Sequence, residues 1–184
     1  MGKIILHLNI TPDGFCDHRA AVVDTEMMKS VNLLLGSVDR ALFGRTTFQL
    51  FEDYWPSVWK DKKGSEDDII FSGRMENMEK MVFSKTLLRT EWKNSRVMNE
   101  LNKQEITEIK DRGGDIIVFG SPGLAGQLIE HDLVDDFYFL VHPFISGAGP
   151  RLFHMKQPEA IKKLHFKNAE TFHSGAVILS YSCK

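Results

Sequence analysis

The chain has 184 residues, of which 42% are hydrophobic, so it is long enough to bury a sizeable core and we expect one domain over residues 1–184. Its 23 basic and 25 acidic residues give a formal net charge of −2. That balance argues against nucleic acid or an anionic membrane surface as the main partner.

The first predicted strand, residues 3–10, is an apolar run that is interrupted by His7 and Asn9. It is too short and too polar for a signal-peptide core or a membrane span, so a cytoplasmic location is expected. Cys16 and Cys183 lie far apart and form no CxxC motif, which indicates free thiols in a reducing compartment. We interpret Cys16 as a small packing residue rather than a nucleophile.

Helical patterns follow this strand. A helix is expected after Asp24 or Thr25, either of which can cap it, because apolar residues then recur on one face. Thr46 opens a second helix with aromatic residues three and four apart, and Pro56 is expected to stop it. A polar loop over residues 57–68 is predicted next.

The remaining elements alternate between strand and helix. Further strands are predicted over residues 41–43, 80–84, 95–98, 116–119 and 137–141, and further helices over residues 69–78, 101–110 and 124–129. Two alternating segments, 164–172 and 176–182, indicate a terminal hairpin. The pattern predicts an α/β fold with a mostly parallel central sheet, a C-terminal antiparallel hairpin and helices on both faces.

The most informative turn connects the strand at residues 116–119 to the helix that follows it. The turn and the start of the helix consist of Gly120, Ser121, Pro122, Gly123 and Leu124. Glycine lets a backbone approach a phosphate closely, and the free N–H groups of a helix N-terminus attract anions. This turn therefore predicts a phosphate-bearing ligand. A second glycine-rich turn, with Gly147 and Gly149, follows the next strand.

Motifs of other protein classes are absent from the sequence. It contains neither GxGxxG nor GxxxxGK[ST], which argues against a Rossmann dehydrogenase and a P-loop hydrolase. The seven histidines show no HxxxH or HExxH spacing, so no metal site is expected. The sequence also lacks the GxSxG motif that marks the turn carrying a serine nucleophile.

A second loop that suits phosphate comes after the strand at residues 41–43. Gly44 lets a phosphate approach the backbone closely, and Thr46 and Thr47 offer hydroxyl groups. Arg45 can donate two hydrogen bonds to phosphate oxygens. The alternative is that Thr46 only caps the following helix while Arg45 lies in solvent. Taken alone, the loop favours the alternative.

Four segments occur in a characteristic order. They are TPDG at residues 11–14, LFGRTTF at 42–48, VFSKTL at 82–87 and, within 115–153, a glycine-serine turn followed by LVDD and GAGPRLF. Together they resemble the C-terminal reductase domain of the bifunctional riboflavin-biosynthesis deaminase-reductase and the dihydrofolate-reductase-like family around it. The resemblance covers nearly the whole chain.

The resemblance implies a three-layer dihydrofolate-reductase-like fold that binds NADPH. The implied cofactor residues are Gly44, Arg45, Thr46, Thr47, Ser84, Lys85, Gly120, Ser121, Pro122, Gly123 and Leu124. Arg45 and Lys85 are expected near the adenosine 2′-phosphate, which would favour NADPH over NADH because only NADPH carries that charge.

The resemblance also supplies candidates for the reaction. Folate-reducing members carry a carboxyl group on the first helix, so Asp24 and Glu26 are the candidate catalytic proton donors, although helix capping also explains Asp24. The candidate substrate contacts are Asp13, Phe15, Phe48 and Trp55. A turn role for Asp13 and a core role for the aromatic residues are the alternatives.

The expected function is the NADPH-dependent reduction of a small heterocyclic substrate, resembling 5-amino-6-(5-phosphoribosylamino)uracil reductase. The alternatives are a dihydrofolate-type reductase and a non-catalytic NADP(H)-binding domain. Phe15 stands where riboflavin-pathway domains usually carry a lysine, and no deaminase half accompanies the chain. We therefore predict that this protein does not replace the riboflavin reductase.

A homodimer is the expected partner arrangement, because riboflavin-type reductase domains commonly pair through their sheets. The terminal hairpin carries apolar residues that could contribute to such a contact, namely Leu164, Phe166, Val177 and Leu179. The alternative is that these residues complete the core.

Overall fold

The computed structural model describes residues 1–152 and 161–183, so Phe153, which ends the GAGPRLF motif, lies outside the described residues. The strands are β1 (Ile4–Ile10), β2 (Val38–Gly44), β3 (Glu79–Phe83), β4 (Ser95–Met98), β5 (Asp115–Phe119), β6 (Asp136–Val141), β7 (His165–Thr171) and β8 (Val177–Ser182). The helices are α1 (Thr25–Leu34), α2 (Arg45–Asp61), α3 (Glu66–Asn77), α4 (Lys103–Asp111) and α5 (Pro122–Glu130), with short 3₁₀ turns η1 (His18–Ala20) and η2 (Leu35–Ser37).

All these strands form one sheet in the order β4-β3-β2-β5-β1-β6-β8-β7. β1 lies in the interior, where Ile5 is in register with Ile117 of β5 and Asp136 of β6, both in parallel strands. β8 runs antiparallel to β6, and β7 runs antiparallel to β8. The prediction of a mostly parallel sheet with a C-terminal antiparallel hairpin is confirmed.

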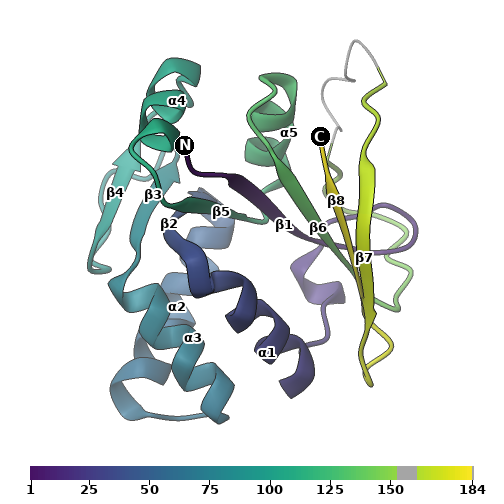
Figure 1. Cartoon of the computed structure of the whole chain (residues 1–184). Coiled ribbons are helices and arrows are strands. Elements are labelled where there is room, and N and C mark those ends of the chain that lie inside the picture. Colours follow the sequence, from purple (N-terminus) through teal and green to yellow (C-terminus); the bar gives the residue numbers. More distant parts are fainter. Residues whose placement is uncertain (153–160, 184) are drawn as a thin grey trace.

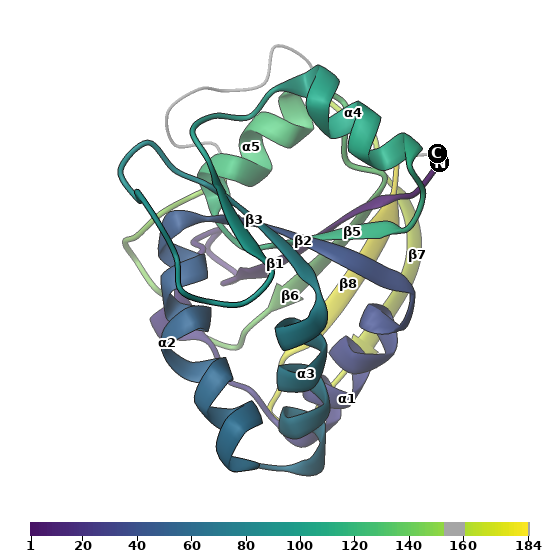
Figure 2. The same cartoon turned by 90° about the vertical axis from the view of Figure 1, so that its left-hand side faces the viewer.

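Helices cover both faces of the sheet (Figure 1). Helices α4 and α5 pack on one face, against side chains such as Leu6 and Val118. Helices α1, α2 and α3 pack on the other face, against Ile5 and Phe43. Figure 2 shows the sheet edge-on between these two layers. Because alternate side chains of β1 and β5 enter two different cores, β1 is continuously apolar over residues 4–6 and β5 over residues 116–119.

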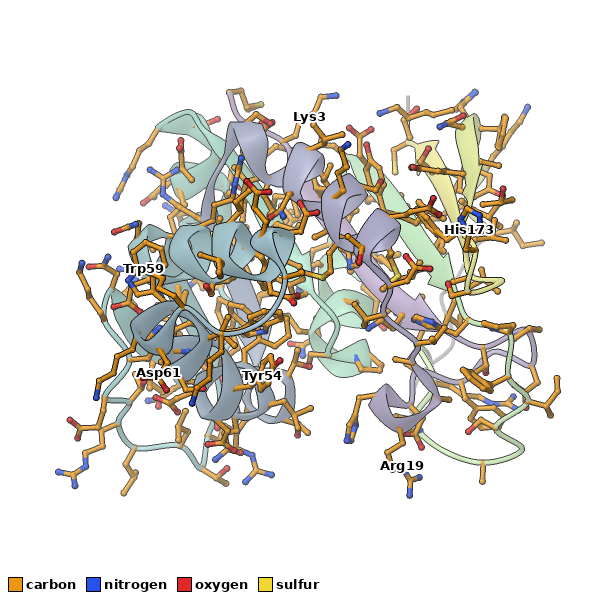
Figure 3. The ribbon with its side chains drawn as sticks, turned by 90° about the horizontal axis from the view of Figure 1, so that it is seen from below. Lys3, Arg19, Tyr54, Trp59, Asp61 and His173 are labelled. Atoms are coloured by element: carbon orange, nitrogen blue, oxygen red, sulfur yellow. The ribbon has the colours of Figure 1, made fainter. Side chains whose placement is uncertain are left out.

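The prediction that Pro56 stops the second helix is wrong, since α2 continues to Asp61 and Pro56 lies inside it. Proline removes one backbone donor, but packing of the last turn compensates for that loss. Val58 is buried, and the Trp59 ring lies so close to Gly73 of α3 that a Cβ there would come within 2.6 Å of it. Figure 3 shows Trp59 and Asp61 at this end of the α2–α3 pair.

The loop predicted over residues 57–68 is correspondingly shorter. Helix α3 begins at Glu66, because Ser65 forms a capping box with Asp68. The Ser65 side chain accepts from the Asp68 amide, and the Asp68 carboxylate accepts from the Ser65 amide. The sequence contained this SxxD signal, but the run of charged residues around it obscured the helix start.

Strand β7 is the outermost strand of the hairpin (Figure 1), and all seven of its residues are exposed. Phe166 is 62% exposed and contacts the Tyr181 ring at 5.9 Å between centroids. Phe166 therefore does not complete the core, whereas Leu164 is partly buried and packs against the core. The homodimer remains a prediction.

No helix among the described residues is both long enough and apolar enough to cross a membrane.

Candidate functional site

Two cavities lie beyond the carboxyl ends of the parallel strands, at the edge of the sheet where ligands bind in open α/β folds. The first, of about 450 Å³, is lined by the junction of β2 and α2 and by the segments that follow β3, β4 and β5, and we call it the outer cavity. The second, of about 250 Å³, is lined by β1, by the first turns of α2 and by residues that follow β1, β5 and β6, and we call it the inner cavity. Ser121 lines both cavities and therefore marks their junction.

The structure brings every predicted cofactor residue to one of these cavities. The outer cavity receives Gly44, Arg45, Ser84, Lys85, Ser121, Gly123 and Leu124. The inner cavity receives Thr46, Thr47, Gly120, Ser121 and Pro122. Three loops that are far apart in the sequence thus meet at one place, and the binding of a cofactor there remains a prediction.

The turn after β5 has an unusual backbone. Gly120 has a φ of 53° and Ser121 a φ of 50°, so two successive residues occupy the left-handed region. A non-glycine residue in this region is uncommon, and such strain clusters at functional sites. The Gly120 amide donates to the His7 carbonyl at 3.0 Å, which ties the turn to β1.

The N-terminus of α5 is left open by this turn. Ser121 makes no side-chain capping bond, and Pro122 at the first helical position has no N–H group. The first amides of a helix cannot bond within the helix, so the N–H groups of Gly123 and Leu124 remain available where both residues line the outer cavity. This arrangement suits an anion.

The loop after β2 forms a second open helix N-terminus. Gly44 is the N-cap of α2 and provides no side chain to cap it, so the alternative that Thr46 caps the helix is wrong. A Cβ at Gly44 would lie 1.9 Å from Ser121 Oγ, which shows how closely the two loops approach. Arg45 is exposed at this cavity, and none of the hydrogen bonds between described residues involves its side chain.

The loop after β3 contributes Ser84 and Lys85 to the outer cavity. Ser84 Oγ accepts from the amides of Thr86 and Leu87 at 3.1 and 2.9 Å, so its hydroxyl holds the loop in a tight turn. Lys85 Nζ lies 3.7 Å from the Glu100 carboxylate, with both side chains exposed. An exposed pair of this kind is weak, so Lys85 can exchange Glu100 for a phosphate.

The inner cavity has an apolar wall and a polar floor. Phe51 and Phe119 stand together on its wall, with ring centroids 5.2 Å apart. His7 meets Phe119 edge-on at 5.8 Å and is buried, and its Nε2 has no hydrogen-bond partner among the described residues. Burial, together with repulsion from His142, lowers the pKa of His7 to about 4, so the imidazole is neutral at pH 7.

A second buried histidine orients the floor. His142 Nδ1 accepts from the Val22 amide at 3.2 Å, which requires the proton to be on Nε2 in the neutral ring. His142 Nε2 lies 3.3 Å from Asn9 Oδ1 and donates to it. Burial lowers the pKa of His142 and favours this neutral form. Asn9 is thereby oriented with its oxygen toward His142.

Asp13 connects two loops instead of contacting either cavity. Its carboxylate accepts from Thr11 Oγ1 at 2.6 Å and from the Gly147 amide at 2.7 Å. These bonds, from Thr11 first, lower the pKa of Asp13 to about 2. Asp13 is therefore a structural link between its own turn and the second glycine-rich turn, in agreement with the turn interpretation.

Three aromatic residues predicted to contact substrate have other partners in the structure. Phe48 is fully buried between Phe43 and Trp92, and Trp55 packs on Phe71 with ring centroids 4.5 Å apart. Phe15 is buried beneath the Arg151 guanidinium, which lies 4.2 Å from its ring centroid. None of the three lines either cavity, and Phe48 and Trp55 belong to the core.

Asp24 and Glu26 also lie outside both cavities. Asp24 caps α1 through the Met27 amide and accepts from the Ser174 amide, while Glu26 pairs with His173 at 2.8 Å. The bonds from Ser174 and Met27 lower the pKa of Asp24, and His173 lowers the pKa of Glu26. These bonds connect α1 to the hairpin, and the structure places neither carboxylate at the two cavities, so their role as proton donors stays a prediction.

Cys16 lines the inner cavity, but burial raises the pKa of its thiol to about 11. The thiol is therefore protonated at neutral pH and is a poor nucleophile, which fits its interpretation as a packing residue. Cys16 and Cys183 are free cysteines. Among the described residues, no group of three or more His, Cys, Asp or Glu side chains is arranged to hold a metal ion.

Sequence reasoning missed the floor of the inner cavity, which consists of His7, Asn9 and the supporting His142. The signal was present, because His7 and Asn9 are polar residues at alternate positions of an otherwise apolar strand. Side chains two apart on a strand share a face, and this face proves to end in a cavity.

These features define an α/β protein of the dihydrofolate-reductase-like fold, with a two-part ligand site at the carboxyl edge of its sheet. The chain belongs to the RibD C-terminal domain family, which matches residues 2–178. It is also 30% identical to the uncharacterized protein YyaP of Bacillus subtilis (strain 168), in an alignment that covers 97% of this chain and 94% of that protein.

Solved structures share the fold at low identity. A protein from Shewanella sp. PV-4 that is proposed to act in riboflavin biosynthesis superimposes with a TM-score of 0.67 at 17% identity, covering 99% of this chain and 98% of that one. A diaminohydroxyphosphoribosylaminopyrimidine deaminase/5-amino-6-(5-phosphoribosylamino)uracil reductase from Thermotoga maritima superimposes with a TM-score of 0.62 at 15% identity. This alignment covers 98% of the present chain but 56% of the Thermotoga chain.

Proposed function

We propose that this protein is an NADPH-dependent reductase of a small heterocyclic compound. One observation carries the proposal: two open helix N-termini and two basic side chains surround an outer cavity that joins an enclosed, aromatic inner cavity at Ser121. A dinucleotide needs this combination, because its phosphates require donors and its reactive ring requires a dry, apolar place beside a substrate.

The residues at the junction fit the phosphates of such a cofactor. The N–H groups of Gly123 and Leu124 and the N-terminus of α2 would hold the pyrophosphate. Arg45 and Lys85 would hold the adenosine 2′-phosphate, since their exposed side chains lie at the same cavity. Gly44 and Gly120 keep the backbone close enough for this contact, because neither carries a Cβ.

The inner cavity would then receive the nicotinamide ring together with the substrate. NADPH supplies the hydride when bound, so the protein has to orient the two rings and exclude water. Phe51 and Phe119 provide flat apolar surfaces for this purpose, and Leu8 and Leu50 complete the apolar lining.

The Thermotoga relative is a reductase of a phosphoribosyl-bearing uracil, and riboflavin-pathway domains usually carry a lysine where this chain has Phe15. In the present structure Phe15 is buried beneath Arg151. We therefore propose a reductase of related chemistry whose substrate differs from that of the Thermotoga protein. Failure of the chain to restore growth of a strain that lacks the riboflavin reductase would support this.

Calorimetric titration of the protein with NADPH and with NADH tests the proposal. We expect NADPH to bind more tightly, and we expect NADPH oxidation when pterin, aminouracil or quinone acceptors are added. Failure of both cofactors to bind would overturn the proposal. Binding of NADPH without oxidation by any acceptor would instead indicate a non-catalytic NADP(H)-binding domain.

A further inference from the structure

A further groove lies at the opposite end of the sheet from the outer and inner cavities. It measures about 560 Å³ and is lined by η2, by the start of β2, by the end of α2 and by α3, and we call it the α2–α3 groove. Val38 of β2 lines this groove, whereas Gly44 at the other end of that strand lines the outer cavity. Since a strand rises about 3.3 Å per residue, the two places are roughly 20 Å apart. The groove shares no lining residue with either cavity.

Most of the α2–α3 groove is apolar. Leu35, Val38 and Met78 line it and are buried. Ile70, on α3, is 40% exposed, and Trp59, near the end of α2, is half-buried (Figure 3). Large apolar side chains that remain partly open to solvent in a concave site suit an apolar ligand.

Arg74 interrupts this apolar lining. It lies in the last turn of α3 and is half-buried, and no hydrogen bond or ion pair between described residues involves its guanidinium. Interaction with the C-terminal dipole of α3 explains a positive charge at this position, but it leaves the guanidinium N–H groups for solvent or a ligand. A carboxylate can accept two of these bonds at once, because its two oxygens match the guanidinium fork.

The charges around the groove favour an anion. Lys62 Nζ lies over the Trp59 ring, 2.8 Å from its centroid, and brings a second positive charge close to the groove. Asp39 is the acidic residue of the described lining, and no ion pair joins it to Arg74. Its Oδ2 lies where a Cβ on Gly114 would collide with it, and Gly114 does not line the groove. The Asp39 carboxylate therefore lies against another part of the protein.

We propose that the α2–α3 groove binds a small apolar monocarboxylate, whose carboxylate accepts from the Arg74 guanidinium and whose hydrocarbon body lies against Trp59 and Ile70. The volume of the groove falls in the range of small-ligand sites. An uncharged analogue would leave Arg74 without a carboxylate partner, and a second carboxylate would be desolvated on the apolar wall. The proposal is independent of the reductase function, because the two sites share no residue.

The test titrates the full chain with indole-3-propionate and with its uncharged counterpart, indole-3-propionamide, in calorimetry and ligand-detected NMR. We expect the acid to bind at millimolar concentration or below, and the amide to bind about tenfold more weakly, because it lacks the charge-assisted bonds to Arg74. The indole N–H signal of Trp59 in nitrogen-15 spectra should shift as the acid is added. Trp59→Phe identifies that signal among the three tryptophans of the chain.

Two variants separate the charge from the apolar wall. Arg74→Gln keeps a polar side chain but removes the guanidinium, so it should weaken the acid about tenfold and leave the amide nearly unchanged. Ile70→Asp places a carboxylate on the apolar wall and should weaken the acid more than the amide. Arg89→Gln makes the same charge change at a side chain that is 88% exposed and serves as the control. A variant that failed to fold would lose both probes, so the ratio of the two affinities is the decisive quantity.

Four results would overturn the monocarboxylate site. They are no binding of the acid, equal affinities for acid and amide, unchanged affinity for the acid in Arg74→Gln, and loss of the acid in Arg45→Gln instead. The last result would place the acid at the open helix N-termini of the outer cavity. A dimer in sedimentation that dissociates in Ile70→Asp would assign the groove to a second copy of the chain, and would also overturn the proposal.

Discussion

The outer and inner cavities share the Ser121 turn but have opposite character. The outer cavity is polar and exposed, with Arg45, Lys85 and two open helix N-termini around it. The inner cavity has an apolar wall that includes Phe51 and Phe119, and a neutral floor made of His7 and Asn9. One continuous site therefore offers charge at one end and hydrogen bonds without charge at the other.

This difference follows from where each cavity lies in the fold. The outer cavity is built from loops and helix ends, whose unpaired amides are solvated and can exchange water for an anion. The inner cavity is built on β1, an interior strand with neighbours on both sides, where an ionised side chain would pay the full cost of burial. Recognition by charge therefore belongs to the loops, and recognition by shape and neutral hydrogen bonds belongs to the sheet.

The largest effect is expected where the two cavities join, in Gly120→Val. A β-branched residue at a φ of 53° costs on the order of 2–3 kcal/mol, and its Cβ would lie 3.2 Å from Thr47 Oγ1. The turn should relax and move its amides, weakening NADPH binding by about a hundredfold in calorimetry. Gly36→Val, in open space with no positive φ, is the control. Undiminished NADPH affinity in Gly120→Val would remove the pyrophosphate from this turn.

The neutrality of the inner cavity can be tested by its effect on stability. The pKa of His7 is 6.5 when unfolded and about 4 when folded, so the unfolded state takes up the proton first as the pH falls. The free energy of unfolding should decrease between pH 6.5 and pH 4 by up to about 3 kcal/mol. Urea unfolding at several pH values should show a smaller decrease in His7→Phe than in the wild type.

His165→Phe, on the exposed strand β7, is the matched histidine control for that measurement. It should retain the pH dependence of the wild type. If His7→Phe and the wild type lose stability in parallel over this range, the imidazole of His7 is not held neutral in the folded protein.

The basic side chains at the outer cavity should make the protein prefer NADPH to NADH. Arg45→Ala should weaken NADPH binding about tenfold, since a charge-assisted hydrogen bond to the 2′-phosphate is lost, and leave NADH binding nearly unchanged. Measurements at two salt concentrations should show a smaller loss at higher salt because exposed charges are screened. Arg89→Ala, whose side chain is 88% exposed, controls for net charge. Equal losses for both cofactors would assign Arg45 to the pyrophosphate or the fold.

The smallest effect is expected for Asp13→Ala, which cuts the link between the two turns beside the inner cavity. Hydrogen exchange at the Ser146 and Gly147 amides should become faster, because both donate to the Asp13 carboxylate. NADPH affinity should change by less than about twofold, since Asp13 does not line the outer cavity. Unchanged exchange at both amides would show that Asp13 does not hold this loop.

Asp13 contributes to stability through a pKa that is lowered from 3.8 to about 2. A lowered carboxyl pKa stabilises the fold above the unfolded value and loses that effect as the pH falls through the folded value. The difference in stability between wild type and Asp13→Ala should therefore be present above pH 3.8 and vanish near pH 2.

The residues of the candidate site that could be predicted from the sequence are those whose role depends on neighbouring residues in the chain. Gly120 and Ser121 follow a strand and precede a helix, so their role at a helix N-terminus is readable from neighbouring residues. Asp24 was assigned to the reaction from the family resemblance, and Phe48 was assigned to the substrate because aromatic residues cluster in this part of the sequence. Asp24 instead bonds Ser174, far along the chain, and Phe48 packs between rings from other elements.

The amino-acid sequence by itself determined the order of strands and helices, the parallel sheet and the glycine turns at its carboxyl edge, because these depend on periodicity and on residues adjacent in the chain. The tertiary structure decided what depends on distant partners. Packing of Trp59 on Gly73 carried α2 past Pro56, and Val22 and His142 oriented the amide of Asn9. Burial beside Phe119 kept the His7 ring neutral and left its Nε2 without a hydrogen-bond partner among the described residues. The cost of charge in the interior is set by surroundings that the linear sequence does not specify.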